Sequence, residues 1–516
     1  MTKPVVFILL LVCSVLQNAE GQSAKQAAHT PTLLTSTATP SMDIFLWFDT
    51  EDYLLPASDD AALRLATFLT QEGIRTTFKV VGEKARTLER RGRHDVIDAL
   101  KKHEIGYHSN WHSVHPTPAQ YLSALGWDEG VAEFIRREGP GMDDVARIFG
   151  QQPSCYGQPG SSWGPQSFAA LRQMNIPVYL DAGSHINLNH QPLWYGGVLT
   201  IFNLQHTLRA ELGGKKDLEG AKKAFLAAKE QVLTHGGGAV HIYYHPCEWV
   251  HQAFWDGVNF SDGANPPRED WKLPPQKTPQ QTEIAFENFE SYVRWIKKQK
   301  DVRFLTASDG LKLYADQALS HKFTPKELNE IAQGVHDSIN FQIHDQLSLS
   351  PAEIFSLLNS RVATLQAEEK SDQVYTLPST IVGPSARGPV LDHPFETTWS
   401  QLQRTSLDVA AYLQRHSRIP STVWLGSKGI SPEAYLVTLA RTIPALIKGN
   451  IPDKILIRPA SLSTAQFIAQ DSEQLWGWLF PKGWHAPDLM ELAKLQAWTI
   501  KPAIRSKLIS ETEKRN

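Results

Sequence analysis

Cysteine is scarce in this chain, which has 516 residues but only 3 cysteines. Cys13 lies in an apolar N-terminal run, so a mature protein without that run keeps only Cys155 and Cys247. These two could pair in an oxidising compartment, and one disulfide is the most that they could form. The alternative is two separate buried thiols, because sequence alone does not give the geometry that decides between the two states.

An excess of either charge is also absent, since 51 Lys and Arg residues stand against 54 Asp and Glu residues. This balance provides no basic surface of the kind that binds nucleic acid, and no acidic tail. Beyond the N-terminus, the sequence lacks an apolar run long enough to span a bilayer. We therefore expect no nucleic-acid partner and no membrane span in the mature chain, and the oligomeric state stays open.

The N-terminus has the features of a secretory signal peptide over residues 1–22. Lys3 gives a positive start, residues 5–15 form an apolar core, and Ala19-Glu-Gly21 provides a small-x-small cleavage site. Val12 precedes Cys13 where a lipoprotein signal requires a small residue, which argues against lipidation. Residues 23–41 are rich in Ser, Thr, Ala and Pro and predict a flexible linker. The protein is therefore expected to be secreted or periplasmic.

Strand and helix patterns alternate over residues 42–316, in a chain long enough for two or three domains. Apolar runs predict strands at 44–48, 76–81, 105–108, 176–180, 198–204, 239–244 and 302–306. Helical patterns occur at 59–72, 83–102, 131–137, 142–149, 167–174, 218–234 and 282–298. This alternation predicts an α/β fold with a parallel sheet covered by helices, and its length suits a barrel. Residues 317–516 are poor in strand patterns and predict a mostly helical C-terminal domain.

Two histidines stand four residues apart in His108-Ser-Asn-Trp-His112, directly after a short predicted strand. An acidic cluster, Phe48-Asp-Thr-Glu-Asp52, closes the first predicted strand. Two imidazoles and a carboxylate make a three-ligand site for a divalent metal, with a coordination position left for water. A second carboxylate could take a proton from that water. The pattern indicates a metal-dependent hydrolase, and zinc suits these ligands, with nickel, cobalt or manganese also open.

The order of these motifs resembles the polysaccharide deacetylase family of carbohydrate esterases. The acidic cluster resembles the first motif of the family, and His103-Glu-Ile-Gly-Tyr-His-Ser-Asn-Trp-His112 resembles its metal motif. The remaining matches, in chain order, are Thr77-Phe-Lys-Val-Val-Gly82, Phe149-Gly-Gln-Gln-Pro153 with Gln158-Pro-Gly160, Tyr179-Leu-Asp181, and Ile242-Tyr-Tyr-His245. The resemblance covers residues 42–316 and implies an irregular (β/α) barrel with a metal at the C-terminal strand ends.

The resemblance also implies roles for individual residues. Asp49 would be the general base, and His245 would be the acid that protonates the leaving amine. His108 and His112 would be metal ligands. The third ligand would be a carboxylate from Glu51 or Asp52, and this choice stays open. Asp181 would orient a neighbour, with His245 as the expected partner. The candidate substrate-binding residues are Trp111, Pro159, Trp163 and Tyr243.

This sequence departs from the pattern of the family in two places. The family usually has an arginine two residues before the proline of its third motif, where it helps to hold the base. Gly157 occupies that position here, so the orientation of the base is left open. His115-Pro116 follows the metal motif and could change which histidines bind the metal.

The C-terminal region contains one suggestive string, Arg418-Ile-Pro-Ser-Thr-Val-Trp-Leu-Gly-Ser-Lys-Gly-Ile-Ser-Pro-Glu-Ala-Tyr435. It resembles a pseudomurein-binding repeat, and Ser350-Pro-Ala-Glu-Ile-Phe355 resembles the end of another. The resemblance implies binding to a cell wall or glycan. The alternative is that these apolar residues form the core of an ordinary helical domain.

The expected function is removal of N-acetyl or O-acetyl groups from a polysaccharide or a peptidoglycan-like polymer. One alternative is hydrolysis of a small amide or cyclic amide at the same site. Another is a non-catalytic glycan-binding protein on a degenerate deacetylase scaffold. Gly157 motivates both alternatives, whereas the presence of both carboxylates and both histidines argues against a decayed site.

Overall fold

The computed structural model describes residues 40–210, 213–365, 373–450 and 452–506. The predicted signal peptide (1–22) and nearly all of the predicted linker (23–41) lie outside the described residues. Within these residues, no helix is long and apolar enough to cross a membrane. Cys155 and Cys247 are both buried and both free, so the two-thiol alternative describes this structure.

The core of the fold is a curled ten-stranded sheet in the order β18-β6-β7-β5-β4-β3-β2-β1-β8, with β9 paired to β1. Most neighbours are parallel, whereas β6 pairs antiparallel with β7 and β18. The strands are β1 (Met42–Thr50), β2 (Thr77–Val80), β3 (Glu104–Tyr107), β4 (Cys155–Tyr156), β5 (Val178–Leu180), β6 (Leu193–Tyr195), β7 (Val198–Ile201), β8 (Gly238–Tyr244), β9 (Val302–Leu305) and β18 (Lys501–Pro502).

Strand β1 is central to this sheet because its apolar run is buried along its whole length. Its first half pairs with β9, its second half with β2, and its opposite edge with β8. Residues after β7 also reach β8, where the backbone N–H of Leu208 donates to the carbonyl of His241 at 2.8 Å. The sheet therefore curls into the irregular (β/α) barrel that the sequence predicts.

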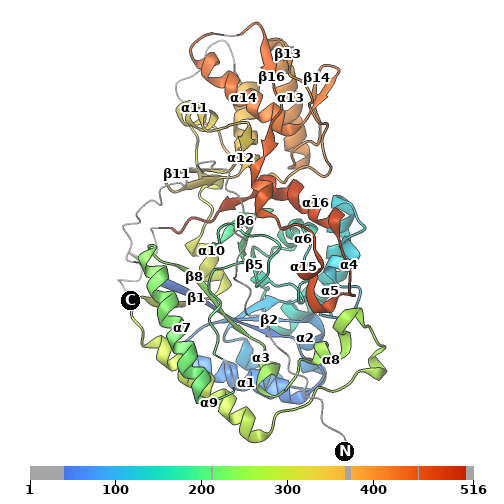
Figure 1. Ribbon diagram of the computed structural model, residues 1–516, viewed down its shortest axis with the longest axis vertical. Helices are drawn as coiled ribbons and strands as arrows, with labels where there is room; N and C mark the ends of the chain where they lie inside the picture. The colour runs from blue at the N-terminus through green and yellow to red at the C-terminus, as the bar shows by residue number, and fades with distance from the viewer. Residues whose placement is uncertain (1–39, 211–212, 366–372, 451, 507–516) are drawn as a thin grey trace, which may run out of the picture. The chain divides into compact units, whose positions relative to one another are not determined.

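Helices connect and cover the strands. They are α1 (Pro56–Gln71), α2 (Gly82–Arg90), α3 (His94–Leu100), α4 (Pro118–Leu122), α5 (Trp127–Phe149), α6 (Gln166–Gln173), α7 (Lys215–Thr234), α8 (Trp255–Phe260), α9 (Pro279–Lys297) and α10 (Ala307–Leu313). Helices α7 and α9 contact each other on the outer surface of the barrel, beside β1 and β8 (Figure 1). Helix α8 belongs to the Pro-rich segment between β8 and α9.

Helix α5 differs from the sequence prediction, which placed two shorter helices on either side of Pro140. The structure has a single helix that continues through this proline. Proline removes one helical hydrogen bond and disturbs the carbonyls of the preceding turn. Here the Asn110 side chain donates to the carbonyl of Arg137 at 2.9 Å, and the Tyr107 hydroxyl donates to the next carbonyl at 2.8 Å. Both carbonyls lie in the turn before Pro140 and have side-chain partners from the segment of Tyr107 and Asn110.

The C-terminal region has a second hydrophobic core of its own. Its helices are α11 (Pro325–Gln333), α12 (Pro351–Ala363), α13 (Trp399–His416) and α14 (Pro432–Ile447). Two hairpins, β11 (Gln342–His344) with β12 (Leu347–Leu349) and β14 (Val423–Leu425) with β15 (Lys428–Ile430), each lead directly into a helix. Two further short pairs join β10 (Ser338–Ile339) to β17 (Ser461–Leu462) and β13 (Phe395–Thr397) to β16 (Ile455–Ile457).

The two hairpin-helix units repeat one local design. In each unit a serine caps the helix and a proline is the first helical residue, at Ser350-Pro and Ser431-Pro. The cap oxygen accepts a backbone N–H of the first turn, and proline loses nothing there because that N–H is free anyway. The later segment, with α15 (Glu473–Trp476) and α16 (Pro487–Leu495), packs into the barrel core and ends in β18. The barrel core therefore includes residues from both ends of the described chain.

His185 provides a test of the packing between the barrel and this returning segment. Its ring is buried against Trp163 and Trp476, at centroid distances of 5.2 and 5.1 Å. Burial lowers its pKa to about 3, whereas a histidine in an unfolded chain titrates near pH ~6.5. Between these values the unfolded state binds a proton that the folded state does not. The free energy of unfolding should therefore fall as pH decreases from ~6.5 towards 3, by up to ~1.4 kcal/mol per pH unit.

We expect His185→Met to reduce this loss, because methionine does not titrate and fills a similar apolar space. Chemical denaturation at pH 7 and pH 4.5 should show a smaller drop in unfolding free energy for this variant than for the wild type. His235→Gln, at an exposed position, is the control and should keep the wild-type drop. Equal drops in all three proteins would contradict the prediction.

Candidate functional site

The sequence-predicted site residues gather at the carboxyl ends of the parallel strands, which is the face where barrel enzymes carry their active sites. Asp49 is the penultimate residue of its strand, and each of the others directly follows a strand. Asp49 and Glu51 come from the end of β1, His108 follows β3, Asp181 follows β5 and His245 follows β8. One mouth of the barrel therefore collects these side chains from the ends of four strands.

Glu51, His108 and His112 form a buried group whose ligand atoms all lie within 4.8 Å of one another. The Oε2 atom of Glu51 lies 2.9 Å from Nε2 of His112 and 3.6 Å from Nε2 of His108. His112 Nε2 makes no hydrogen bond of acceptable geometry, although it is buried. An unsatisfied ligand atom facing a carboxylate is what a cation between them would explain. Two imidazoles and one carboxylate fit a divalent metal, and zinc suits this set.

Glu51, and not Asp52, belongs to this group. The Oδ1 atom of Asp52 accepts the backbone N–H of Leu54 at 2.8 Å. Its Oδ2 atom lies 3.6 Å from Nδ1 of His251, a residue outside the group. His115, which could have replaced another ligand, instead contacts Gln120 Oε1 through Nδ1 at 2.7 Å.

Hydrogen bonds behind the two histidines leave their Nε2 atoms free to bind a metal. His108 Nδ1 donates to the carbonyl of Gly157 at 3.0 Å. His112 Nδ1 lies 2.8 Å from the hydroxyl of Ser113, and that hydroxyl donates to Oδ2 of Asp256 at 3.0 Å. The hydroxyl therefore accepts from His112, which keeps the proton on Nδ1. Such partners fix the tautomer and orientation of metal-binding histidines.

Asp256 is a residue that sequence reasoning missed. It lies in α8, about 140 residues after His112 (143 between Ser113 and Asp256), with no spacing that links it to the metal motif. Burial raises its pKa to about 6, with Glu51 adding to the shift and His112 opposing it. The carboxylate is therefore ionised above that pH and accepts a hydrogen bond from the hydroxyl of Ser113.

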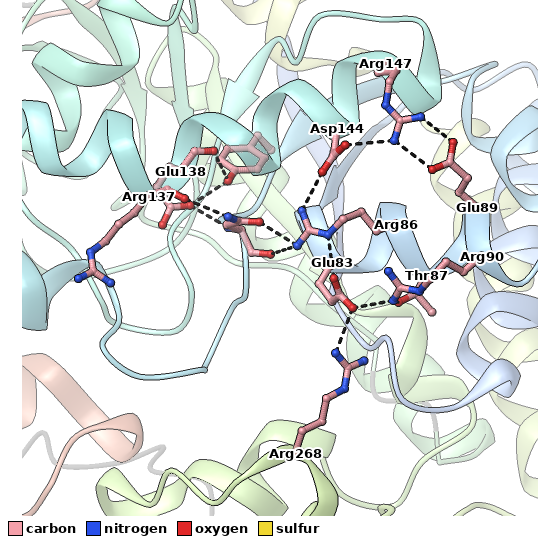
Figure 2. A network of polar contacts seen from close by, with 12 residues as sticks. Glu83, Arg86, Thr87, Glu89, Arg90, Arg137, Glu138, Asp144, Arg147 and Arg268 are labelled. Atoms are coloured by element: carbon pink, nitrogen blue, oxygen red, sulfur yellow. Dashed lines mark hydrogen bonds and ion pairs between the residues drawn. The ribbon is translucent and has the colours of Figure 1, made fainter.

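The loop that carries His108 and His112 has an uncommon backbone conformation. Ser109 and His112 have φ values of 64° and 54°, in the left-handed region where residues other than glycine pay an energetic cost. Hydrogen bonds hold the loop between them: the N–H of Asn110 donates to Oε2 of Glu138 at 2.7 Å, and Arg86 donates to Oδ1 of Asn110 at 2.9 Å. Figure 2 shows Arg86 between Asp144 of α5 and the region of this loop.

The same network anchors the segment that contains α8. Glu83 of α2 binds Arg86 at 2.8 Å and Arg268 at 3.2 Å, and Figure 2 shows these side chains meeting at Glu83. Arg268 comes from the segment after α8. The network therefore connects helix α2 to the loop that carries His108 and His112, here called the metal loop, and to the segment with Asp256.

His245 has a partner other than the one expected from the sequence. Its Nδ1 atom lies 2.8 Å from Oε1 of Glu248, and its Nε2 atom lies 3.7 Å from Oδ2 of Asp49. Burial lowers the pKa of His245, but Glu51 and Glu248 outweigh burial and raise it to about 9. Burial likewise raises the pKa of Glu51, while His112 and His245 hold it well below its ordinary range.

Asp181 was expected to orient His245, but the structure pairs it with Lys79. Its Oδ2 atom accepts from Nζ of Lys79 at 3.0 Å, and Oδ1 accepts the N–H of Ala182 at 2.7 Å. The position beside His245 is taken by Glu248, three residues further along the chain, which also accepts the backbone N–H of His245. Lys79 stands in a matched motif, but its role was not predicted.

The four candidate substrate-binding residues have different environments. Trp111 is 43% exposed and lies in the metal loop, with the Arg86 guanidinium 4.8 Å from its ring centroid. Trp163 is fully buried, with its ring stacked on that of His185. Pro159 is also buried, and Tyr243 stacks on Trp47 at 4.4 Å. Phe254, which the sequence did not single out, is 38% exposed with its ring 4.8 Å from that of His245.

The comparisons with known proteins gave matches only among solved structures. No protein-family model matches the sequence, and no curated protein matches it. A candidate polysaccharide deacetylase from Mycobacterium smegmatis is 14% identical over 55% of this chain and 93% of its own, with a TM-score of 0.36. A peptidoglycan deacetylase from Bacillus subtilis is 16% identical over 52% and 89%, with a TM-score of 0.26. An allantoinase is 10% identical over 55% and 95%, with a TM-score of 0.36.

We expect Asp256→Asn to weaken zinc binding by about 10–100-fold, which is the usual effect of removing a partner behind a metal-binding histidine. The amide has a similar shape but lacks the charge that holds the Ser113 hydroxyl and, through it, His112. Zinc affinity at pH 7.5 would be measured by competition with a chromophoric chelator. Asp262→Asn, in the same segment but exposed, is the control and should bind zinc like the wild type. Equal affinities for all three proteins would refute the role of Asp256.

Proposed function

We propose that this protein is a metal-dependent hydrolase that removes N-acetyl or O-acetyl groups from a polysaccharide. The observation that carries the proposal is the buried group of Glu51, His108 and His112 with two further groups beside it. Asp49 and His245 lie within 3.7 Å of each other, and His245 Nε2 is 3.9 Å from Oε2 of Glu51. A hydrolase of amides needs a base and an acid next to a site that activates water, and these two residues can fill both roles.

A divalent metal held by Glu51, His108 and His112 would supply Lewis acidity, which lowers the pKa of water and polarises a carbonyl. Asp49 would take the proton from the attacking water, and its Oδ2 atom faces the site. His245 would donate a proton from Nε2 to the departing amine, because an amine leaves poorly unless it is protonated. Glu248 contributes to the raised pKa of His245 through its charge and a hydrogen bond, which favours the protonated ring. Glu248 holds Nδ1 and thereby directs Nε2 towards the substrate.

A sugar polymer is the proposed substrate because exposed aromatic rings flank the site. Trp111 lies in the metal loop and Phe254 packs edge-on against His245. Aromatic faces provide large rigid apolar contact areas, which suit the apolar face of a sugar ring. A small or cyclic amide at the same site remains the alternative, and the choice of substrate in the assay distinguishes them. Secretion also remains a prediction from the sequence.

We expect the zinc-loaded protein to release acetate from N-acetylated chito-oligosaccharides or peptidoglycan, and to lose this activity with a chelator. Asp49→Asn should lower kcat by about 10²–10⁴-fold with zinc still bound, since it removes the base. His245→Gln should lower kcat for amides by a similar factor, but much less for an aryl acetate, whose leaving group needs no proton. Acetate release, zinc content and folding would be measured for each variant.

Each outcome of this experiment has a separate meaning. Hydrolysis of small or cyclic amides without acetate release from any glycan would favour the alternative substrate. Absence of bound zinc, together with activity that is indifferent to chelator, would reject the mechanism. Glycan binding that survives Asp49→Asn and His108→Ala, without hydrolysis by the wild type, would favour the non-catalytic alternative.

We further propose that the C-terminal region holds the enzyme on its polymer. The support is an exposed aromatic side chain on one of the two hairpin-helix units. Trp424 is 60% exposed on β14, opposite Gly429 of β15, so no side chain of the paired residue covers it. Ile343, at the matching place of the other hairpin, is 40% exposed.

Trp424→Ala should reduce retention of the protein on insoluble peptidoglycan or chitin, because it removes the exposed ring. It should leave turnover of soluble oligosaccharides unchanged, since the ring belongs to a region with a core separate from that of the barrel. Leu407→Ala, an exposed apolar residue of α13, is the control. Retention that is equal for wild type and both variants in a pull-down would argue against this role.

A further inference from the structure

Lys79 is a buried cation in the barrel to which the proposed mechanism assigns no role. Its side chain is fully buried on β2. Its Nζ atom lies 3.0 Å from Oδ1 of Asp49 and 3.0 Å from Oδ2 of Asp181. It also lies 3.9 Å from the centroid of the Trp47 ring. One ammonium group therefore bridges two carboxylates inside the barrel.

The strand register brings Lys79 to this position. Lys79 pairs with Asp49 of β1 on one side and with Gly106 of β3 on the other. A Cβ atom at Gly106 would lie 2.9 Å from Cγ of Lys79, which is closer than real Cβ contacts. The glycine on β3 thus gives the lysine stem room to cross the neighbouring strand.

A second glycine gives room for the charged end. A Cβ atom at Gly157 would lie 2.1 Å from Nζ of Lys79 and 2.5 Å from Oδ2 of Asp181. The ammonium of Lys79 therefore occupies the space that any side chain at position 157 would need. The two residues therefore depend on each other, because the ammonium of Lys79 fits only when position 157 has no side chain.

The bridge separates the two oxygens of Asp49. Oδ1 faces Lys79 at 3.0 Å and His108 Nδ1 at 3.6 Å, whereas Oδ2 faces His245 Nε2 at 3.7 Å. A carboxylate held through one oxygen cannot rotate freely, so the other oxygen keeps a fixed direction. Burial without a cation would also be costly for Asp49 and Asp181, because unpaired buried charges are strongly unfavourable.

We propose that Lys79 is a positioning residue for the general base: it holds Oδ1 of Asp49 so that Oδ2 faces the reacting water, in space that Gly157 leaves empty. This inference rests on the proposed function, because it assigns a role within that reaction. Lys79 acts through Asp49 and contacts neither substrate nor metal. Burial lowers the pKa of Lys79, but the two carboxylates outweigh burial and raise it, so the ammonium stays charged.

The first test is Lys79→Met, which keeps the length of the stem and removes the charge. We expect kcat for acetate release to fall about 10²-fold, as for other misplaced catalytic groups, with KM and zinc content unchanged. Lys79→Arg keeps the charge and should retain more activity than Lys79→Met. A purely structural role would lower the melting temperature but would leave kcat per folded, zinc-loaded molecule at the wild-type value.

The control is Lys501, another buried lysine between two carboxylates. Its Nζ atom lies 2.7 Å from both Asp316 and Glu353, outside the site. Lys501→Met should lower the melting temperature but leave kcat and KM unchanged. A comparable loss of kcat in Lys501→Met would mean that any lost buried lysine impairs catalysis, and would overturn the inference.

The second test measures the coupling between Lys79 and Gly157. Gly157→Ala in the wild type should displace the ammonium and lower both kcat and the melting temperature. In the Lys79→Met background the same change should lower kcat and the melting temperature less, because the closest contact, that with the ammonium, is gone and the contact with Asp181 remains. Contacting residues show such non-additivity, whereas distant residues do not. Equal losses of kcat and melting temperature in both backgrounds would overturn the proposal that Lys79 and Gly157 share this space.

Lys79→Met could unfold the protein by leaving two unpaired buried carboxylates, so Lys79→Met/Asp181→Asn is the second variant. It removes one negative charge together with the positive one, and should fold better while kcat stays low. Thermal unfolding of the metal-free proteins gives a readout that does not depend on activity. Recovery of kcat along with folding in the double variant would overturn the positioning role.

Failure of the inference is distinguishable from failure of the proposed function. A wild type that is active, an inactive Asp49→Asn and a fully active Lys79→Met would overturn only the role of Lys79. A wild type without zinc-dependent hydrolysis would overturn the proposed function, and the positioning role would fall with it.

Discussion

The balance of buried charge at the mouth of the barrel is the constraint on which the rest of the site depends. Asp49, Glu51 and Asp181 are almost completely buried in a small region. Buried carboxylates are tolerated only when cations and hydrogen bonds compensate them. Lys79 compensates Asp49 and Asp181, and the imidazoles of His112 and His245 stand beside Glu51. A divalent cation bound to Glu51 would instead compensate the negative charge of this carboxylate.

The metal loop shows how the fold supports this charge arrangement. Its left-handed backbone at Ser109 and His112 is unfavourable by itself and needs compensating contacts. Glu138 accepts the N–H of Asn110, and the carbonyls around Pro140 accept from Asn110 and Tyr107. Residues of α5 just before Pro140 thus supply the acceptors that hold Tyr107 and Asn110 in place.

The sequence predicts those features that local patterns determine. The apolar run of β1 and the motif from His108 to His112 are short local patterns that can be recognised in the sequence. The alternation of strands and helices is likewise a series of local patterns, so pattern and resemblance together predict these features. The barrel and the group of Glu51, His108 and His112 were accessible in this way. The choice between Glu51 and Asp52 was not, because it depends on which carboxylate the backbone N–H of Leu54 captures.

The features that the sequence does not predict depend on register and on long-range packing. Lys79 stands in a motif that was quoted for its resemblance, yet its role follows from its pairing with Asp49 and Gly106 in adjacent strands. The sequence shows that Gly157 stands where the family pattern has an arginine. It does not show that Lys79, from a neighbouring strand, places an ammonium group in the same space. Trp163 is a candidate substrate-binding residue in the sequence because it lies near a motif, and the sequence does not show that its ring packs against His185.

The segment between β8 and α9 contributes more to the site than its loop-like composition indicated. Trp255 donates from Nε1 to Oε1 of Glu51 at 3.2 Å, which leaves Oε2 as the oxygen that faces both histidines. Asp256, the next residue, fixes the tautomer of His112 through Ser113. Two ligands of the metal group therefore take their orientation from adjacent residues of α8, and Phe254, just before them, packs against His245. The strands of the barrel carry the residues of the proposed metal site, and this segment orients them, so substitutions in it are expected to change both the proposed metal site and the proposed substrate contacts.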